Sequence, residues 1–565
     1  MASGIGLSKP APRKEALFSR RQIEGLIANG RSIIIVDGKV LKVDAWRKYH
    51  PGGEKVIMHM VGRDATDEVN ALHSAEARQY MLKYQIGRIE GRWRNFLPPV
   101  QGGVFRPYVE DTESIVGEEE DDVPSTASSS APSTPIFDAA ENSSVSLRRL
   151  ELHETSSVSS FSSIELPPSN NGGKLSHMDA RTQEEIDIDL AKYPALDPDT
   201  QSDIVQKYRM LYKRLQDERL FDCHYSAYAI ESCRYCLLFG LFLLFLRCGW
   251  YGTSGLFLGM CWHQLVFTVH DAGHMGITHN FTFDTVIGII IADYIGGLSL
   301  GWWKRSHNVH HVVTNSPEHD PDIEHLPFFA VSHRFFESLR STYHEHIMTY
   351  DPFAKFTIRY QHYLYYPILL FGRFNLYRLS WEFLILGQGP RKGPARWHRW
   401  FEIAGQVFFW YWFGYHVLYK SVPSASGRWA LVMVSHMVTA ILHVQITLSH
   451  FGMSTADLGI NECFPQKMLR TTMDVDCPEW LDFFHGGLQF QAIHHLFPRI
   501  PRHNLRQTQK LVQEFCQEMG IPYALYGFVD GNKEVIGRLA DVGRQAAILA
   551  ECQKAISENG KRHIH

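Results

Sequence analysis

Three kinds of feature are scarce or missing in this chain of 565 residues. The net charge is only −4, so no bulk electrostatic case for binding nucleic acid exists. The nine cysteines all lie at or after Cys223 without repeated paired spacing, which indicates no disulfide framework and favours a cytosol-facing protein. The first residues, MASGIGLSKPAPRKEALFSRR, lack the apolar core of a signal peptide. We therefore expect the N-terminal part to remain in the cytosol.

The low mean hydropathy of −0.19 hides a sharp contrast along the chain. Residues 1–220 are polar, whereas the segments after Tyr235 are aromatic and aliphatic. A chain of this length can hold more than one domain. The contrast predicts a soluble N-terminal part followed by a membrane part.

Residues 18–95 are predicted to form a compact α+β domain. Residues 32–40 (SIIIVDGKV) are typical of two strands joined by a turn at residues 37–38. His50 opens an HPGG turn, and His73 follows a helical-looking segment. Two histidines from separate segments can bind one haem iron from opposite faces, which leaves no open position for oxygen. Such a domain would carry electrons rather than perform chemistry.

This N-terminal domain resembles cytochrome b5 in its HPGG turn, its GRDATDE segment and its LHS segment. The resemblance implies a bound haem b with His50 and His73 as the axial ligands. His59 matches no ligand position of that family, and we interpret it as an ordinary exposed histidine.

Residues 101–180 are predicted to be a disordered linker. An acidic run at residues 118–122 is followed by PSTASSSAPSTP and SSVSSFSSIELPPSNNGG. Such sequence has too little apolar surface to offset the entropy of ordering. We interpret it as a tether that keeps the haem domain near its partner without fixing its pose.

Residues 225–530 are predicted to form an all-α polytopic membrane domain, and residues 531–565 a C-terminal tail. The predicted domain has about four transmembrane helices: a hairpin on either side of Arg247, and the segments 401–420 and 429–449. Together these crossings place every histidine cluster described below on the cytosolic face.

Two further apolar segments are not expected to cross the membrane. A crossing by residues 282–305 would separate two histidine clusters, so we expect this segment to be re-entrant or interfacial. Residues 357–387 are interrupted by Arg373, Arg378 and Glu382, which favours an interfacial amphipathic helix.

Eight histidines are concentrated beside the apolar stretches. Their spacings of three and four residues place the members of each cluster on one helical face. Imidazole is a common ligand of iron, and ionisable groups at a membrane are rarely accidental. The clusters are HDAGH (His270, His274), HNVHH (His307, His310, His311) and QAIHH (His494, His495), with His450 standing apart. The pattern predicts a histidine-rich metal site at the cytosolic face, which could hold more than one metal ion.

Two nearby residues leave alternatives open. His443 lies two helical turns before His450 and is interpreted as a partly buried helix residue rather than a ligand. Gln491 holds the first position of the last cluster, where an amide oxygen could ligate weakly or act through water.

Residues 225–530 resemble the membrane fatty-acyl desaturase superfamily. The fused haem domain and Gln491 in the last cluster point to the front-end desaturases. HDAGHMGITHN, SHNVHHVVTNSPEHDPDIEH and QFQAIHHLFPRIPRHNLR are most similar to the fungal sphingolipid Δ8-desaturases. This resemblance implies two non-haem iron ions held by the eight histidines, with Gln491 at the position of the divergent ligand.

The resemblance also implies partners and a location. The substrate would be ceramide or another sphingolipid, with O2 as co-substrate and cytochrome b5 reductase as the electron source. The protein would lie in the bilayer of the endoplasmic reticulum, with its haem domain and C-terminus in the cytosol.

The expected reaction is the insertion of a double bond into the long-chain base of ceramide. Removing hydrogens from unactivated methylenes needs an oxidant that iron and oxygen can supply. A front-end fatty-acyl desaturase acting on acyl-lipid or acyl-CoA and a lipid hydroxylase remain alternatives. A membrane-anchored haem electron carrier is disfavoured, because an anchor needs one span and no histidine clusters.

Overall fold

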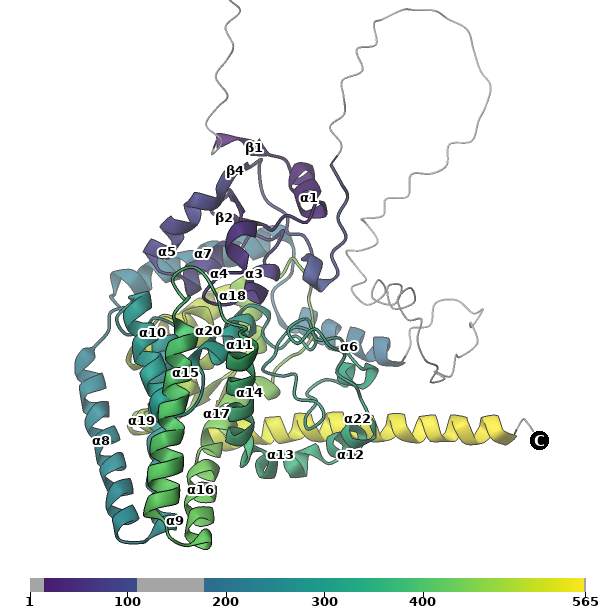
Figure 1. Cartoon of the computed structure of the whole chain (residues 1–565). Coiled ribbons are helices and arrows are strands. Elements are labelled where there is room, and N and C mark those ends of the chain that lie inside the picture. Colours follow the sequence, from purple (N-terminus) through teal and green to yellow (C-terminus); the bar gives the residue numbers. More distant parts are fainter. Residues whose placement is uncertain (1–14, 109–176, 563–565) are drawn as a thin grey trace, which may run out of the picture.

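The computed structural model describes residues 15–108 and 177–562. Most of the predicted linker, residues 101–180, therefore lies outside the described residues. Figure 1 shows a small N-terminal domain seated on a larger helical domain.

The N-terminal domain is built on a four-stranded sheet in the order β1-β4-β3-β2. Asp37 and Gly38 both have positive φ, as a two-residue hairpin turn requires, and they join β2 to β3 in antiparallel register. The predicted hairpin is thus confirmed. The strands are β1 (Leu17–Phe18), β2 (Ile33–Val36), β3 (Lys39–Lys42) and β4 (Gln85–Ile89), and the helices are α1 (Arg20–Ala28), α2 (Asp44–Arg47), α3 (Glu54–Met58), α4 (Thr66–Leu72) and α5 (Ala75–Met81).

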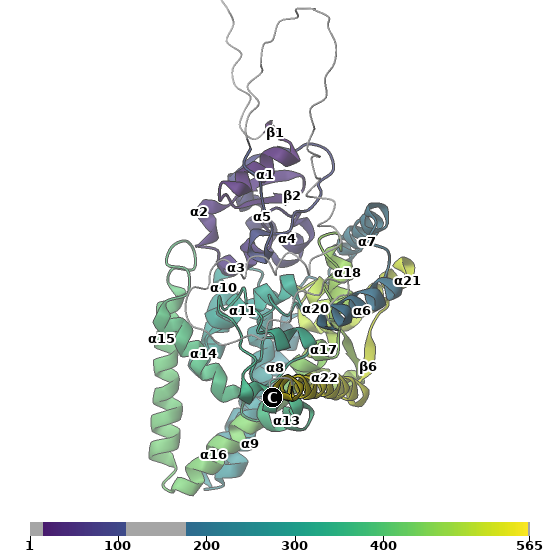
Figure 2. The same cartoon turned by 90° about the vertical axis from the view of Figure 1, so that its right-hand side faces the viewer.

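Four long helical segments of the second domain extend away from the haem domain, as Figure 1 and Figure 2 show. Helix α8 packs along α9, and α9 packs along α16. Trp250, Tyr419 and Trp429 lie at the far ends of these segments, and all three are more than 60% exposed. The segments are α8 (Tyr225–Arg247), α9 (Tyr251–Gly273), α15 (His398–Phe409) continued by η8 (Trp410–Ser421), and α16 (Ala425–Val438) continued by α17 (Ala440–Phe451).

Within the described residues, two helices are long and apolar enough to cross a membrane, Tyr225–Arg247 and Ala425–Phe451. A third is added if the bent pair Phe281–Ile295 and Leu300–Val313 counts as one span. Two of the four predicted crossings therefore meet this criterion. The other two, α9 and the continuous α15–η8 segment, have the length but carry more polar residues, such as His263 and Gln264 of α9.

The bent pair lies where a re-entrant segment was predicted. It consists of α10 (Phe281–Ile289), η6 (Ile290–Ile295) and α11 (Leu300–Val313), and the helix axis bends by 118° between its two arms. Gly297 at the bend has a φ of +71°, and a Cβ there would lie 2.4 Å from the ring of Phe409. Only glycine suits both conditions. The chain thus turns back at this bend, as a re-entrant segment requires.

The prediction of one helix over residues 357–387 is wrong, although, as predicted, no candidate span is found in this part of the described chain. The chain instead forms three short helices, α12 (Pro352–Arg359), α13 (Gln361–Leu369) and α14 (Gly372–Leu386). Arg378 and Glu382 are exposed as expected, but Arg373 is only 3% exposed. The Arg373 guanidinium donates to the carbonyl of Gly296 and stacks over Trp262 at 4.1 Å. Tertiary contacts thus bury a charge that the sequence placed at the membrane surface.

The last part of the chain forms a layer under the haem domain and a long final helix. Val535, Leu539 and Val542 of this helix are buried where it packs against α12, α13 and α17. The predicted boundary at residue 531 therefore falls inside a helix that belongs to the domain. The elements are α18 (Phe464–Thr471), β5 (Asp474–Asp476), α19 (Asp482–His485), α20 (Gln491–Leu496), α21 (Leu505–Met519), β6 (Leu525–Gly527) and α22 (Phe528–Arg562).

Candidate metal centre and haem site

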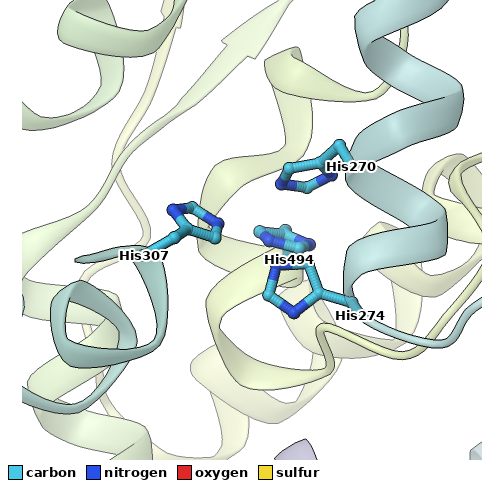
Figure 3. A group of neighbouring side chains, drawn as sticks. All are labelled: His270, His274, His307 and His494. Atoms are coloured by element: carbon cyan, nitrogen blue, oxygen red, sulfur yellow. The ribbon is translucent and has the colours of Figure 1, made fainter. Parts of the chain in front are cut away.

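One group of histidines gathers where α9, α11 and α20 meet. The ligand nitrogens of His270, His274, His307 and His494 all lie within 4.8 Å of one another. His270 lies in the last turn of α9 and His274 is the C-cap residue of that helix. Their spacing of four residues places both rings on the same side of α9 (Figure 3). Four nitrogens at this separation can surround one metal ion.

A second group lies beside the first. His310, His450 and His495 come from α11, α17 and α20, are all buried, and keep their ligand nitrogens within 4.8 Å of one another. His310 and His307 belong to one helix, but their offset of three residues directs them to different groups. Helix α11 therefore serves both groups at once.

His311 stands next to the first group. Its Nε2 is 3.1 Å from the Nε2 of His307 and 3.1 Å from the Nε2 of His494. The structure thus brings all eight histidines named from the sequence into one connected set. His443 is partly buried and lies outside both groups. Its ring packs against Gly372, where an added Cβ would lie 2.9 Å from His443 Nε2.

The chemical state of His494 and His495 fits metal binding. Burial lowers the pKa of His494 and of His495 well below the ordinary value, and the neighbouring histidines lower it further. Both rings are therefore neutral at pH 7, with a lone pair to offer. The Nε2 of His274 is buried and has no hydrogen-bond partner among the described residues. A bound metal ion would satisfy such a nitrogen.

Two acidic residues beyond α11 were missed by the reasoning from sequence. The Nδ1 of His310 lies 2.8 Å from Asp320 Oδ2, and the Nδ1 of His307 lies 3.6 Å from Asp322 Oδ2. Burial disfavours charge on Asp322, yet the two histidines hold the pKa of its carboxyl below the usual range. A carboxylate on Nδ1 orients the ring and directs Nε2 toward a metal. The signal was present as paired acids in HDPDIEH, which begins eight residues after the end of HNVHH.

Replacing Asp320 with asparagine is expected to lower iron affinity or activity by about 10- to 100-fold, because His310 loses the carboxylate that orients it. Iron content by mass spectrometry and turnover of the purified protein measure the effect. Asp351→Asn is a matched control, because Asp351 is an exposed helix cap and asparagine caps equally well. A fully iron-loaded, active Asp320→Asn variant would contradict the assigned role.

His50 and His73 face each other in the N-terminal domain. Their Nε2 atoms are 3.5 Å apart, while Nδ1 of His50 lies 2.9 Å from the carbonyl of Gly53 and Nδ1 of His73 lies 3.2 Å from that of Val69. Desolvation lowers the pKa of His50 to about 4 and that of His73 to about 3. Both rings are thus neutral and present Nε2 to the same point, which fits the axial ligation of a haem iron.

The prediction that His59 is exposed is wrong. Its side chain is fully buried, its Nδ1 lies 2.9 Å from Gln101 Nε2, and its ring centroid is 5.3 Å from that of His319 in the second domain. The second domain covers a surface that would be open in the isolated N-terminal domain. The sequence carried no sign of this contact.

The haem-ligand turn rests directly on α11. A Cβ on Gly52 would lie 2.8 Å from Asn308 Nδ2, and one on Gly53 would lie 3.1 Å from Arg305 Cγ. Arg499 donates to the carbonyl of His73 at 3.1 Å. The helix that carries His307, His310 and His311 therefore also touches the turn that carries His50. This arrangement gives a short path between the two sites.

Charge and apolar contacts define the pose of the haem domain. Arg209 donates two hydrogen bonds to Asp67, at 2.7 and 3.1 Å, and Lys55 pairs with Glu345. The haem domain is therefore docked by specific contacts of its own, whereas most of the predicted tether lies outside the described residues. The apolar part of the interface joins Val56, Met60 and Val69 to Val309, Val312 and Val313.

Replacing Arg209 with glutamate is expected to slow reoxidation of the reduced haem by about two- to fivefold, the effect of a partly exposed ion pair. Stopped-flow absorbance with substrate and O2 measures this rate, and the haem spectrum should not change. The double variant Asp67→Arg with Arg209→Asp should restore the rate. Slow transfer in the double variant as well would argue against this docking contact.

Comparison with known proteins agrees with this geometry. The family "Fatty acid desaturase" matches residues 249–527, and the family "Cytochrome b5-like Heme/Steroid binding domain" matches residues 19–90. The Delta 8-(E)-sphingolipid desaturase of Emericella nidulans is 66% identical over 97% of this chain and 98% of that protein. The protein of the same name from Candida albicans is 45% identical over 96% and 98%.

A plant relative is similar over a shorter length. The Delta(8)-fatty-acid desaturase of Helianthus annuus is 37% identical over 62% of this chain and 75% of that protein. The N-terminal domain implies a haem, the desaturase family implies iron, and both histidine groups lie within the residues that the desaturase family matches. The chain belongs to the fatty acid desaturases, in the group with a fused cytochrome b5-like domain that includes the fungal sphingolipid desaturases.

Proposed function

We propose that this protein inserts a trans double bond at C8 of the long-chain base of ceramide, using O2 and electrons that pass through its own haem domain. The observation that carries the proposal is the double role of α11, which supports the His50 turn and bears three of the eight clustered histidines. The names of the fungal relatives supply the position and the E geometry.

In this proposal the two histidine groups each hold one iron ion. His270, His274, His307 and His494 surround the first, and His310, His450 and His495 the second, with His311 between them. Gln491 opens α20, is buried one turn before His494, and is proposed to contribute its amide oxygen directly or through water. His443 is proposed to play no part in ligation.

The bound iron would supply the oxidant for the C–H bonds, and haem b between His50 and His73 would supply single electrons. The chain's own residues do the rest. Asp320 and Asp322 fix the tautomers of His310 and His307. Burial of the histidine set excludes bulk water from the reacting position.

The topology belongs to the same proposal. Helices α8, α9, α15–η8 and α16–α17 are proposed to cross the bilayer of the endoplasmic reticulum four times, with Trp250, Tyr419 and Trp429 at the lumenal interface. The haem domain, both histidine groups and α22 then lie on the cytosolic side. Cytochrome b5 reductase is the proposed electron source there.

Expression in a yeast that lacks long-chain-base unsaturation tests the proposal. Mass spectrometry should locate a new trans double bond at C8 of the long-chain base. Unsaturation confined to fatty acyl chains would favour a front-end acyl desaturase instead. A hydroxylated base without an alkene would favour a lipid hydroxylase. Both outcomes contradict the proposed function.

A further inference from the structure

A groove lies between the haem-ligand turn and helices α10, α11, α14 and α15. Its lining includes Pro51 and Gly53 of the haem domain, so both domains close it. The lining is mixed: Phe281, Ile289 and Phe383 are apolar, and Lys304, His398 and Glu402 are polar. A lipid with a polar end matches such a lining.

Glu402 is a buried carboxylate held by one of its two oxygens. Its side chain is only 2% exposed, the hydroxyl of Ser299 donates to Oε2, and the N–H of Gly301 donates to the same oxygen at 3.1 Å. Among the described residues, every hydrogen bond to Glu402 ends on Oε2. A buried carboxylate oxygen without a donor is costly. Oε1 is therefore available to a donor that enters the groove.

Gly301 permits this arrangement. A Cβ at position 301 would lie 2.6 Å from Glu402 Oε1 and 3.0 Å from the ring of Phe383. Any other residue would thus push against the free oxygen. The neighbouring acid, Asp293, is satisfied separately by Gln406 at 2.9 Å and by the N–H of Leu300 at 3.3 Å. Glu402 is the acid that the groove presents.

Lys304 supplies a donor that lines the same groove. It lies one helical turn after Gly301 on α11, and its Nζ stands 5.5 Å from the ring centroid of Phe281. The groove thus offers an acidic acceptor and a basic donor beside apolar side chains. The polar end of ceramide carries hydroxyl and amide donors and an amide carbonyl acceptor. The ester group of a glycerolipid has no hydrogen-bond donor to offer Glu402. An acyl-CoA would bring negatively charged phosphates toward the acidic side chain of Glu402.

We propose that Glu402 and Lys304 bind the polar end of the sphingolipid substrate, with the C1 hydroxyl donating to Glu402 Oε1 and the amide carbonyl accepting from Lys304 Nζ. This inference rests on the proposed function and adds the residues that would select the substrate.

The position of the groove also accounts for where the double bond forms. Gly301, which holds Glu402, precedes His307 by six residues of α11, about 9 Å along the helix axis. An extended alkyl chain between C1 and C8 covers a similar length. A substrate anchored at Glu402 and running along α11 would therefore bring C8 to the histidine groups. The distance between the bound polar end and the histidine groups would thus select the carbon that reacts.

Kinetics of the purified full-length protein with a short-chain ceramide and with its 1-deoxy analogue, which lacks the C1 hydroxyl, test the site. In Glu402→Gln the KM for ceramide should rise about tenfold, the size of one hydrogen bond to a charged group. The kcat should change little, and the KM for 1-deoxyceramide should stay the same. Glu382→Gln is the matched control, because Glu382 is exposed on α14 and pairs only with Arg378.

A second variant reaches the same oxygen from the other side. Gly301→Ala places a methyl group at Glu402 Oε1 and should raise the KM for ceramide selectively, with no further rise when it is combined with Glu402→Gln. An equal rise for both lipids, or no rise in either variant, overturns the site while ceramide desaturation persists. A wild-type protein that desaturates only fatty acyl chains overturns the proposed function instead.

Discussion

Replacing His310 with alanine is expected to abolish desaturation and to release iron from the protein. His310 lies at the junction of the two histidine groups, with its Nε2 3.2 Å from the Nε2 of His495 and its ring 4.5 Å from that of His450. Its loss leaves the second group with two imidazoles, too few to hold an iron ion firmly. Iron analysis of the purified variant and product analysis in yeast measure both effects.

The variant should still fold, so the result can be interpreted. Asp320, which His310 contacts, keeps hydrogen bonds from the N–H groups of Asn315 at 2.7 Å and Asp322 at 2.9 Å. The haem spectrum of the N-terminal domain reports on overall integrity. His443→Ala is the matched control, since His443 lies on α17 outside both groups. Iron loss from His443→Ala, or full iron in His310→Ala, would contradict the assignment of ligands.

Replacing His50 with alanine is expected to remove the six-coordinate haem spectrum and to stop activity, while non-haem iron stays bound. The two Nε2 atoms that face each other at 3.5 Å are the only point in the described part of the N-terminal domain where two imidazoles can meet one iron. Without that haem, electrons no longer reach the histidine groups from within the chain. Absorbance spectra, iron content and turnover are the measurements, in a host that lacks its own cytochrome b5.

His59→Gln is the control for this second prediction. His59 is buried against Gln101 and His319, away from the facing pair, so its replacement should keep the haem spectrum. Added cytochrome b5 should restore part of the activity of His50→Ala, because the metal centre itself is intact. Full activity of His50→Ala without any added carrier would refute electron supply through the fused domain.

Both metal-binding regions could be recognised from local sequence because their geometry is short-range. The HPGG turn fixes the position of His50, and the helix before His73 ends at that residue. The offsets of three and four in HNVHH follow from helical periodicity alone, and α11 is the helix they required. The β2–β3 hairpin was equally local, since its turn residues carry its conformation.

Other features depended on contacts between distant segments. Asp320 and Asp322 became partners of histidines only because the chain folds back after α11, and His59 was buried only because a second domain covers it. Arg373 looks like an interfacial charge in the sequence, and nothing there gives the partners of Glu402; both are buried against residues more than 70 positions away. A sequence pattern shows the helical or strand periodicity of an element, but it does not show which distant residues pack against that element.

The sequence by itself determined the two-domain plan, the residue types that can hold haem and iron, and the helical spacing that presents them. The tertiary structure decided which nitrogens share a group, how the haem domain is docked, and which polar side chains are enclosed. The physical reason is that backbone conformation and side-chain spacing are local properties, whereas burial and hydrogen-bond partnership depend on which surfaces meet after folding.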